Sequence, residues 1–220
     1  MFDINKHFYQ YHYNKLVLID KILPEIICQN LANRAEQLAI SGKAIQVNSK
    51  GKGTSDILDG GGDYLYKVMD MQKIITYFPE LVPLYHSMVP LISVITHGDV
   101  ITSPHSGSEI TLKIYQDKKA AQGWHYDTNT ITALLYLTTN QEGATVCKVQ
   151  KHHPSWTKPK VKTHKIYPRA GSLLLMQGRE VWHCAEPLIN EIKVVVPFNY
   201  YLKNDTWRPA GIDDLVYGKN

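Results

Sequence analysis

The sequence lacks the features that define several classes of protein. Its three cysteines, Cys28, Cys147 and Cys184, are odd in number and have no paired spacing, which argues against a disulfide framework and favours a reducing compartment. No apolar run reaches the roughly 20 residues of a membrane span. The opening "MFDINKHFYQYHYNK" has no long apolar core and no small-residue cleavage site, so it does not read as a secretory signal. We therefore expect a cytoplasmic protein without a membrane partner.

The charge of the chain is only mildly unbalanced. Its formal net charge is +4, with a pI near 8.8. This leaves nucleic acid or an anionic small molecule possible as a partner and requires neither. A length of 220 residues with 44% hydrophobic composition predicts one globular domain over residues 1–220. The sequence does not indicate which oligomeric state the protein adopts.

The first half of the chain has mainly helical patterns. The segment "KLVLID" (15–20) reads as a short strand, and a helix is expected from Pro24 until Gly42 can stop it. Residues 43–63 are rich in Gly, Ser, Lys and Asp and are predicted to be loop. Helical segments follow over 70–95, and we expect interruptions at Pro79, Pro83 and Pro90.

The second half changes to short β-rich runs separated by turn residues. These runs are "EITLKIYQ", "TITALLYLTT", "ATVCKVQ", "KTHKIYP", "GSLLLMQ" and "IKVVVPFNYYL". Many short strands with turn signals indicate a barrel or jelly roll. The predicted fold is therefore mainly β with N-terminal helices: a helical support region with loops over 1–105, and a β-core over 106–205.

One group of residues in the β-core has the composition of a metal site. His125 and Asp127 stand two apart at the head of a strand-like run, and alternate residues of a strand share a face, so both could bind one ion. His183 lies beyond a later predicted strand. Two histidines and one carboxylate form the facial triad of non-heme Fe(II) oxygenases. The alternatives are an ordinary polar pair here, or the second His-x-Asp pair at His97–Asp99, where a turn beside a helix end is expected.

A lysine stands inside the last apolar run. Lys193 lies in "IKVVV", and a cation in a buried strand is costly unless it meets an anion. One carboxylate of a cosubstrate would be such an anion. The alternative is a surface lysine whose stem covers apolar groups while its amine reaches water.

Taken together, these motifs resemble a known family. His-x-Asp, then Gly-Ser-Leu-x-Leu, then His, then a cation ten residues later is similar to the Fe(II)- and 2-oxoglutarate-dependent oxygenases. Lysine in place of the usual arginine, Pro187 after the second histidine, and the "LVLIDKILPEIICQNLANRA" opening look like the prolyl 4-hydroxylase subgroup. The resemblance is strongest over residues 109–202 and weaker over 15–40.

The resemblance implies a fold, a set of cofactors and roles for individual residues. The core would be a double-stranded β-helix, with Fe(II) held by His125, Asp127 and His183. Lys193 would bind the distal carboxylate of the cosubstrate 2-oxoglutarate, and Tyr115 would line its pocket. Many relatives have Ser or Thr two residues after the cation, whereas this chain has Val195, so Tyr115 or another hydroxyl would have to assist.

The implied reaction uses O₂, forms succinate and CO₂, and usually hydroxylates an unactivated C–H bond. Relatives that halogenate have Gly or Ala in place of the metal-binding carboxylate. Asp127 therefore argues against halogenation, though not against desaturation or ring formation.

The substrate is the least determined part of the prediction. A small amino-acid-like or peptidyl substrate is expected, and candidate contacts are Arg179, Trp124 and Trp182, each of which could instead be solvated or simply packed. The basic stretch 148–169 could attract an acidic substrate or nucleic acid, or could be a solvated hairpin. Two alternatives stay open: a nucleic-acid demethylase of the same chemistry, and a non-catalytic metal-binding β-core module.

Overall fold

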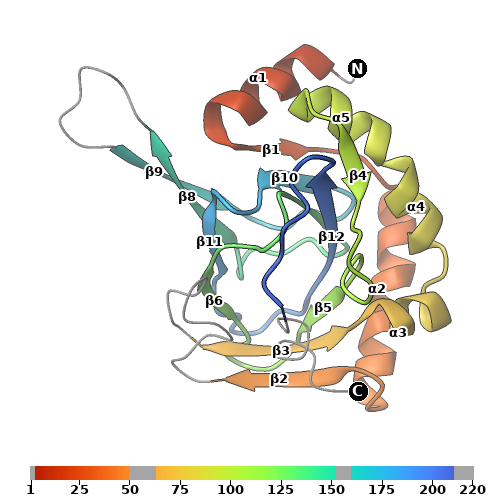
Figure 1. The fold of residues 1–220 in the computed structure, drawn as a ribbon. Helices are drawn as coiled ribbons and strands as arrows, with labels where there is room; N and C mark the ends of the chain where they lie inside the picture. The colour runs from red at the N-terminus through yellow and green to blue at the C-terminus, as the bar shows by residue number, and fades with distance from the viewer. Residues whose placement is uncertain (1–2, 50–62, 152–159, 211–220) are drawn as a thin grey trace.

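The strands of the described residues form two antiparallel sheets that face each other (Figure 1). The computed structural model describes residues 3–49, 63–151 and 160–210. The larger sheet has the order β1-β10-β7-β12-β5-β3-β2, with β4 paired to β12, and the smaller has the order β6-β11-β8-β9. The strands are β1 (Leu16–Ile19), β2 (Ile45–Ser49), β3 (Tyr64–Met69), β4 (Val100–Thr102), β5 (Leu112–Tyr115), β6 (Gln122–His125), β7 (Ile131–Tyr136), β8 (Thr145–Lys151), β9 (Lys160–Ile166), β10 (Leu173–Gln177), β11 (Trp182–Ala185) and β12 (Lys193–Leu202).

The larger sheet is buried on both faces, and this explains its continuous apolar runs. In β10, Leu173 and Leu175 belong to the core between the sheet and the helices. The alternate residues Leu174 and Met176 belong to a second core between the two sheets. Because side chains of a strand alternate in direction, "LLLMQ" supplies both cores at once.

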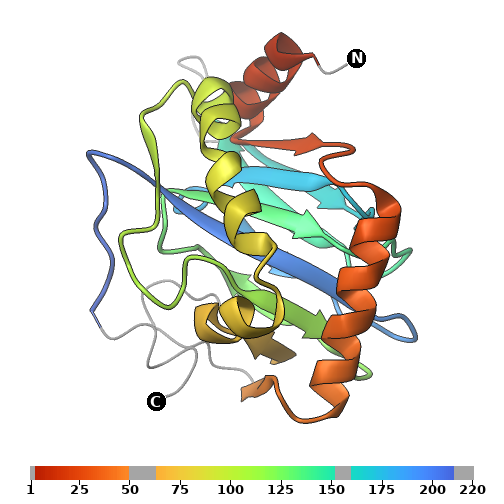
Figure 2. The same cartoon turned by 90° about the vertical axis from the view of Figure 1, so that its right-hand side faces the viewer.

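Within the part of the chain that the structure describes, five helices precede most of the strands: α1 (Ile4–Asn14), α2 (Glu25–Ile40), α3 (Met71–Tyr77), α4 (Leu81–Ser87) and α5 (Val89–Thr96). Figure 2 shows α2, α4 and α5 lying across the outer face of the larger sheet. They leave the inner face to the smaller sheet. The predicted fold class, mainly β with N-terminal helices, is confirmed.

The prolines mark the helix boundaries only in part. Helix α2 begins directly after Pro24, Pro79 lies in the break between α3 and α4, and Pro90 lies in the first turn of α5. The expected interruption at Pro83 is wrong, because this residue is in the first turn of α4, where its missing N–H breaks no helical hydrogen bond. Helix α1 had no counterpart in the sequence prediction.

The predicted loop over 43–63 is wrong at its start. Residues Ile45–Ser49 form β2, which pairs with β3 and extends the larger sheet by one strand at its edge. Ile45 pairs with Val68 of β3, and most side chains of β3 are buried. The stability gained from this pairing and burial outweighs the low strand propensity of the polar segment. The rest of that predicted loop, 50–62, lies outside the described residues.

No single helix among the described residues is long and apolar enough to cross a membrane. The bent pair formed by Met71–Tyr77 with Leu81–Thr96 meets the length and composition criteria together.

Candidate metal centre and adjoining pocket

Two histidines meet across neighbouring strands of the smaller sheet. His125 is the last residue of β6, and His183, only 5% exposed, lies directly opposite it in β11. In each ring, Nδ1 donates to the carbonyl two residues earlier, at 2.8 Å to Gly123 and 2.9 Å to Val181. A carbonyl can only accept, so these contacts place the proton on Nδ1 and leave a lone pair on Nε2. Both imidazoles are therefore prepared to bind a metal through Nε2.

The carboxylate of Asp127 reaches the same point from a loop. The sequence analysis placed Asp127 on one strand with His125, but β6 ends at His125 and β7 begins only at Ile131. The loop is held by a hydrogen bond from Asp127 N–H to the Gly178 carbonyl, at 3.0 Å. The Thr132 hydroxyl donates to Asp127 Oδ2 at 2.5 Å. Orientation of the carboxylate thus comes from β7 and the β10–β11 turn, and not from strand alternation.

The three side chains converge closely enough to share one ion. Nε2 of His125 is 3.5 Å from Asp127 Oδ1, and Nε2 of His183 is 3.6 Å from Asp127 Oδ2. The candidate ligand atoms of all three lie within 4.8 Å of one another. Ligands about 2.0–2.2 Å from a first-row metal have comparable separations. Two imidazoles and one carboxylate suit non-heme Fe(II) and leave coordination positions for other ligands.

Electrostatics keeps these groups in the protonation states that a metal needs. Burial alone would raise the pKa of Asp127, but His183, His125 and the Thr132 hydrogen bond outweigh it and hold the pKa well below its usual range. Burial, reinforced by His125, lowers the pKa of His183 to about 4. At neutral pH the site therefore contains a carboxylate and a neutral His183.

Lys193 lies buried in the same pocket, opposite Tyr115. The two residues pair across β12 and β5, and the Lys193 amine is 4.6 Å from the centre of the Tyr115 ring. Lys193 is 1% exposed, and its amine donates to the Gly143 carbonyl at 2.7 Å. Among the described residues, no carboxylate forms an ion pair with it. Burial, and then the charge of Lys113, lower its pKa to about 7.

A second lysine in the pocket was missed by the sequence analysis. Lys113 lies in β5, and its amine donates to Gln122 Oε1 at 2.9 Å. The Tyr115 hydroxyl donates to the same oxygen at 3.0 Å, while the Gln122 amide contacts His125 Nε2 at 2.9 Å. Gln122 therefore connects Lys113, and the Tyr115 hydroxyl beside Lys193, to His125 of the triad. Like Lys193, Lys113 is a cation inside a β-rich run, "EITLKIYQ". This shared pattern is the sequence signal that could have identified it.

Further polar residues complete the pocket and carried no clear sequence signal. The hydroxyl of Thr145, in β8, accepts a hydrogen bond from Tyr136 at 2.8 Å and lies on the pocket wall. Arg208, after β12, reaches the pocket and donates to the Ser108 hydroxyl. Neither residue stands in a recognisable motif, because the chain fold alone brings them to the site.

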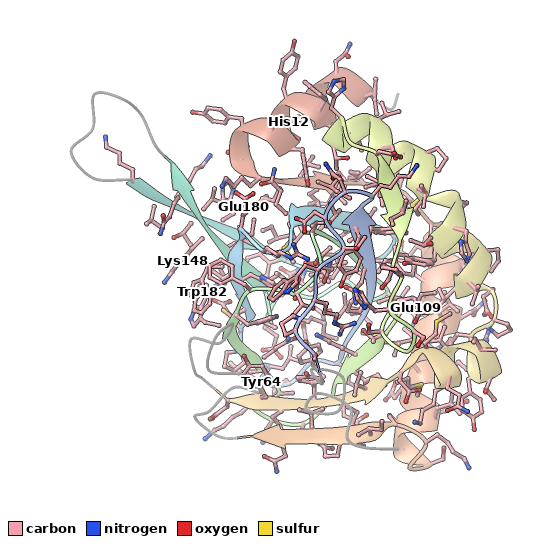
Figure 3. All side chains as sticks on the ribbon, in the orientation of Figure 1. His12, Tyr64, Glu109, Lys148, Glu180 and Trp182 are labelled. Carbon is pink, nitrogen blue, oxygen red and sulfur yellow. The ribbon has the colours of Figure 1, made fainter. Side chains whose placement is uncertain are left out.

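The structure places the three predicted substrate residues beside the triad rather than within its pocket. Trp124 and Trp182 stack at 6.3 Å with an interplanar angle of 12°, and Lys148 lies 4.2 Å over the Trp124 ring. Figure 3 shows Lys148 and Trp182 together at the base of the β8–β9 hairpin. Arg179 and Trp182 line a second cavity, and Tyr126, between two of the triad residues, lines both cavities.

The guanidinium of Arg179 is occupied by contacts within the chain. Its Nε donates to the Thr128 carbonyl at 2.7 Å, and its Nη1 donates to Asp205 at 2.6 Å. Nη2 donates to the Trp207 carbonyl. Arg179 thereby attaches the segment after β12, which carries Arg208, to the loop that follows Asp127.

The competing His-x-Asp pair lies away from the triad. His97 caps α5 in the left-handed conformation, as a turn beside a helix end requires, and the exposed Asp99 pairs with Lys203 at 3.6 Å. That prediction is confirmed. The basic stretch 148–169 is described only outside 152–159. Its β8 and β9 portions form a hairpin, while His152 and His153 lie outside the described residues.

The architecture is shared with solved structures. The chain is similar to the alpha-ketoglutarate-dependent epimerase SnoN in complex with Fe³⁺, alpha ketoglutarate and nogalamycin RO (TM-score 0.69, 13% identity, 96% of this chain and 88% of that one). It is similar to a prolyl-4-hydroxylase of Pseudomonas putida (TM-score 0.61, 14% identity, 91% and 100%). It is also similar to HygX of Streptomyces hygroscopicus with nickel and 2-oxoglutarate bound (TM-score 0.63, 11% identity, 94% and 90%).

The fold is the double-stranded β-helix of the 2-oxoglutarate-dependent oxygenases. This confirms the predicted core. No family model matches the sequence, and no curated protein matches it either. At such low identities the likeness concerns the fold, and function has to be argued from the site itself.

Proposed function

We propose that the protein is an Fe(II)- and 2-oxoglutarate-dependent oxygenase that hydroxylates an unactivated C–H bond of a small amino-acid-like or peptidyl substrate. The observation that carries this proposal is one pocket containing both the His125–Asp127–His183 triad and the buried cation Lys193. The triad offers the ligands that Fe(II) prefers, and Lys193 offers the charge that a dicarboxylate cosubstrate would need. The three free, buried cysteines are consistent with a cytoplasmic setting.

Each residue contributes a separate task. His125, Asp127 and His183 would hold Fe(II), which when bound would supply O₂ activation coupled to conversion of 2-oxoglutarate into succinate and CO₂. Lys193 would hold the distal carboxylate of 2-oxoglutarate as a point charge. Tyr115, beside Lys193, would line the chain of the cosubstrate, and Thr145 offers the hydroxyl that Val195 cannot. Asp127 occupies the position that a halogenase leaves open, which favours hydroxylation.

The predicted substrate contacts fit an approach along the outside of the triad. The rings of Trp182 and Tyr126 pack at 4.6 Å with a tilt of 51° and continue from the triad pocket into the second cavity. With Trp124 they would form an aromatic wall for a substrate side chain. The guanidinium of Arg179 already donates hydrogen bonds to Thr128, Asp205 and Trp207. Arg179 would therefore position the segment after β12 and would not bind the substrate directly.

A nucleic-acid substrate is less well supported. The β8–β9 hairpin projects from the body and carries lysines (Figure 1). However, Lys165 pairs with Glu186 at 2.8 Å, and Lys162 donates to Asn14. These local contacts engage two of the hairpin's lysines within the chain, so we propose no nucleic-acid partner.

The test is reconstitution with Fe(II), 2-oxoglutarate and O₂, with succinate as the readout. We expect slow succinate release without substrate, and faster release with an accepted amino acid or Pro-containing peptide. The substitutions His125→Ala, Asp127→Ala and His183→Ala should each lower release at least 100-fold. Asp99→Ala, in the second His-x-Asp pair, is the matched control and should leave release unchanged.

Two results would contradict the proposal. Succinate release that persists without the triad would reject the metal assignment. Tight, metal-dependent 2-oxoglutarate binding without any succinate release or O₂ uptake would instead indicate a non-catalytic module.

A further inference from the structure

The pocket that contains the triad has an excess of positive charge. Among the described residues that line it, Lys113, Lys193 and Arg208 are cationic and Asp127 alone is anionic, and the two lysines outnumber this carboxylate even when Arg208 is left aside. The charges of a divalent metal and a dianionic cosubstrate cancel. Binding of both would therefore leave the net positive charge of the pocket unchanged. Buried charge of one sign is costly unless it is compensated. The loaded pocket therefore favours one more anion.

The two lysines follow one another along the β5–β12 ladder, and Arg208 contacts Ser108, which precedes β5. Lys193 lies opposite Tyr115, and Lys113 lies opposite Val195, one layer further along. The ladder continues to Asn199, whose amide donates to the Ser108 carbonyl at 2.5 Å. Arg208 donates to the hydroxyl of the same serine. Lys113 thus stands between the cation assigned to the cosubstrate and the cation at the far end.

In the described part of the chain, the amine of Lys113 contacts only neutral groups. Its hydrogen bond goes to the Gln122 carboxamide, and the Tyr66 ring lies 5.3 Å away. Within the described ranges, no carboxylate forms an ion pair with it. Asp127 acts on it at longer range, raising its pKa, whereas burial, the larger effect, lowers the pKa to about 8. Such an environment suits an ammonium group that receives its counter-ion from a ligand.

We propose that Lys113 binds a carboxylate of the substrate, so that the enzyme acts on molecules that carry a free acid group close to the oxidised carbon. This inference rests on the proposed function, because it assigns Lys193 to 2-oxoglutarate and one cosubstrate carboxylate to the metal. Arg208 supplies a second positive charge at the other end of the same wall. Together they distinguish acids from the corresponding amides or esters.

The test uses protein loaded with Ni(II), a redox-inactive substitute, and saturating 2-oxoglutarate. Propionate and propionamide are compared as probes, and the relaxation of their protons by the paramagnetic metal is measured by NMR. We expect propionate to bind at least 10-fold more tightly than propionamide. Lys113→Met should remove this preference, and Lys113→Arg should retain most of it. The Ni(II)-dependent affinity for 2-oxoglutarate should change less than threefold in either variant.

Lys67→Met is the matched control. Lys67 lies on β3, the neighbouring strand, and its amine donates to the Ala39 carbonyl, on the helix side of the sheet. This variant should keep the preference for propionate.

Several outcomes would overturn the inference. Equal relaxation of the two probes in the unmodified protein would reject a carboxylate site. Loss of the propionate signal as 2-oxoglutarate is raised, or a large loss of 2-oxoglutarate affinity in Lys113→Met, would assign Lys113 to the cosubstrate instead. Absence of any Ni(II)-dependent 2-oxoglutarate binding would reject the proposed function itself, a failure seen before any probe is added.

Discussion

The Thr132 hydroxyl donates to Asp127 Oδ2 at 2.5 Å, and Asn129 in turn donates to Thr132 at 2.8 Å. These contacts determine how a carboxylate on a loop faces two histidines on strands. Hydrogen bonds to metal ligands of this kind typically contribute 10- to 100-fold in metal affinity. Thr132 is therefore part of the candidate metal site, although it is not one of the three candidate ligands.

Replacement of Thr132 by valine should weaken metal binding by about 10- to 100-fold, because it removes the hydroxyl at almost unchanged volume. Thr132→Ser should restore most of the affinity. The measurement is a competition titration of Ni(II) or Fe(II) against a chelator. Equal metal affinities for the valine and serine variants would show that the hydrogen bond does not orient Asp127.

Replacement of Lys193 by methionine should abolish 2-oxoglutarate binding and yet stabilise the unliganded protein. Burial lowers the pKa of Lys193 from 10.5 to about 7. As pH falls from 10.5 towards 7, the unfolded state binds a proton that the folded state resists, so lysine costs stability at pH 7. We expect a gain of about 1–3 kcal/mol in the free energy of unfolding, reduced by the loss of the Gly143 hydrogen bond.

Urea titration of the unliganded Lys193→Met protein at pH 7 and at pH 10 checks this. The gain should shrink at pH 10, where the amine is neutral in the folded state and, with its ordinary pKa of 10.5, only partly protonated in the unfolded state. A variant less stable than the unmodified protein at pH 7 would show that Lys193 already has its anion within the chain.

The affinity for 2-oxoglutarate should decrease as pH rises above about 7. A carboxylate binds the ammonium form of Lys193, and that form is lost in the unliganded protein above its pKa of about 7. The apparent Kd should be nearly constant below this pH and rise up to about tenfold per unit above it. Lys193→Arg, which stays charged, should flatten the profile. Calorimetric titration from pH 6 to pH 9 measures it, and a flat profile in the unmodified protein would contradict the assignment.

The residues with distinctive chemistry could be predicted from sequence. His125, His183 and Lys193 carry groups that are rare in buried strands, and their spacing along the chain matches the order of strands in the fold. Runs such as "GSLLLMQ" predicted short strands of a barrel or jelly roll, and the structure adds that the sheet containing them is buried on both faces. These features depend on local pattern, and the structure brings the residues into one pocket.

What could not be predicted depends on contacts between distant segments. Asp127 was assigned to a strand because the pattern does not show that β6 ends at His125. β2 was hidden because its polar segment becomes a strand only by pairing with β3. Arg208 reaches the pocket from the segment after β12, which is held by distant contacts of Arg179 with Trp207 and of Arg208 itself with Ser108.

Replacement of Gly178 by alanine should damage the metal site. A Cβ at this position would lie 2.5 Å from the Asn129 carbonyl oxygen, 2.8 Å from the Thr132 hydroxyl and 3.1 Å from Asp127 Cβ. Since the first contact is with backbone, the loop carrying Asp127 would have to shift, and the Asp127 N–H bond to the Gly178 carbonyl would lengthen. We expect at least a 10-fold loss in metal affinity, measured by chelator competition. Gly42→Ala is the control: its φ of +75° predicts a loss of about 1 kcal/mol in stability, but nothing lies within 4 Å of the new methyl group. Equal metal affinity in the two variants would show that the loop tolerates the displacement, and that Thr132 and the histidines alone hold the carboxylate in place.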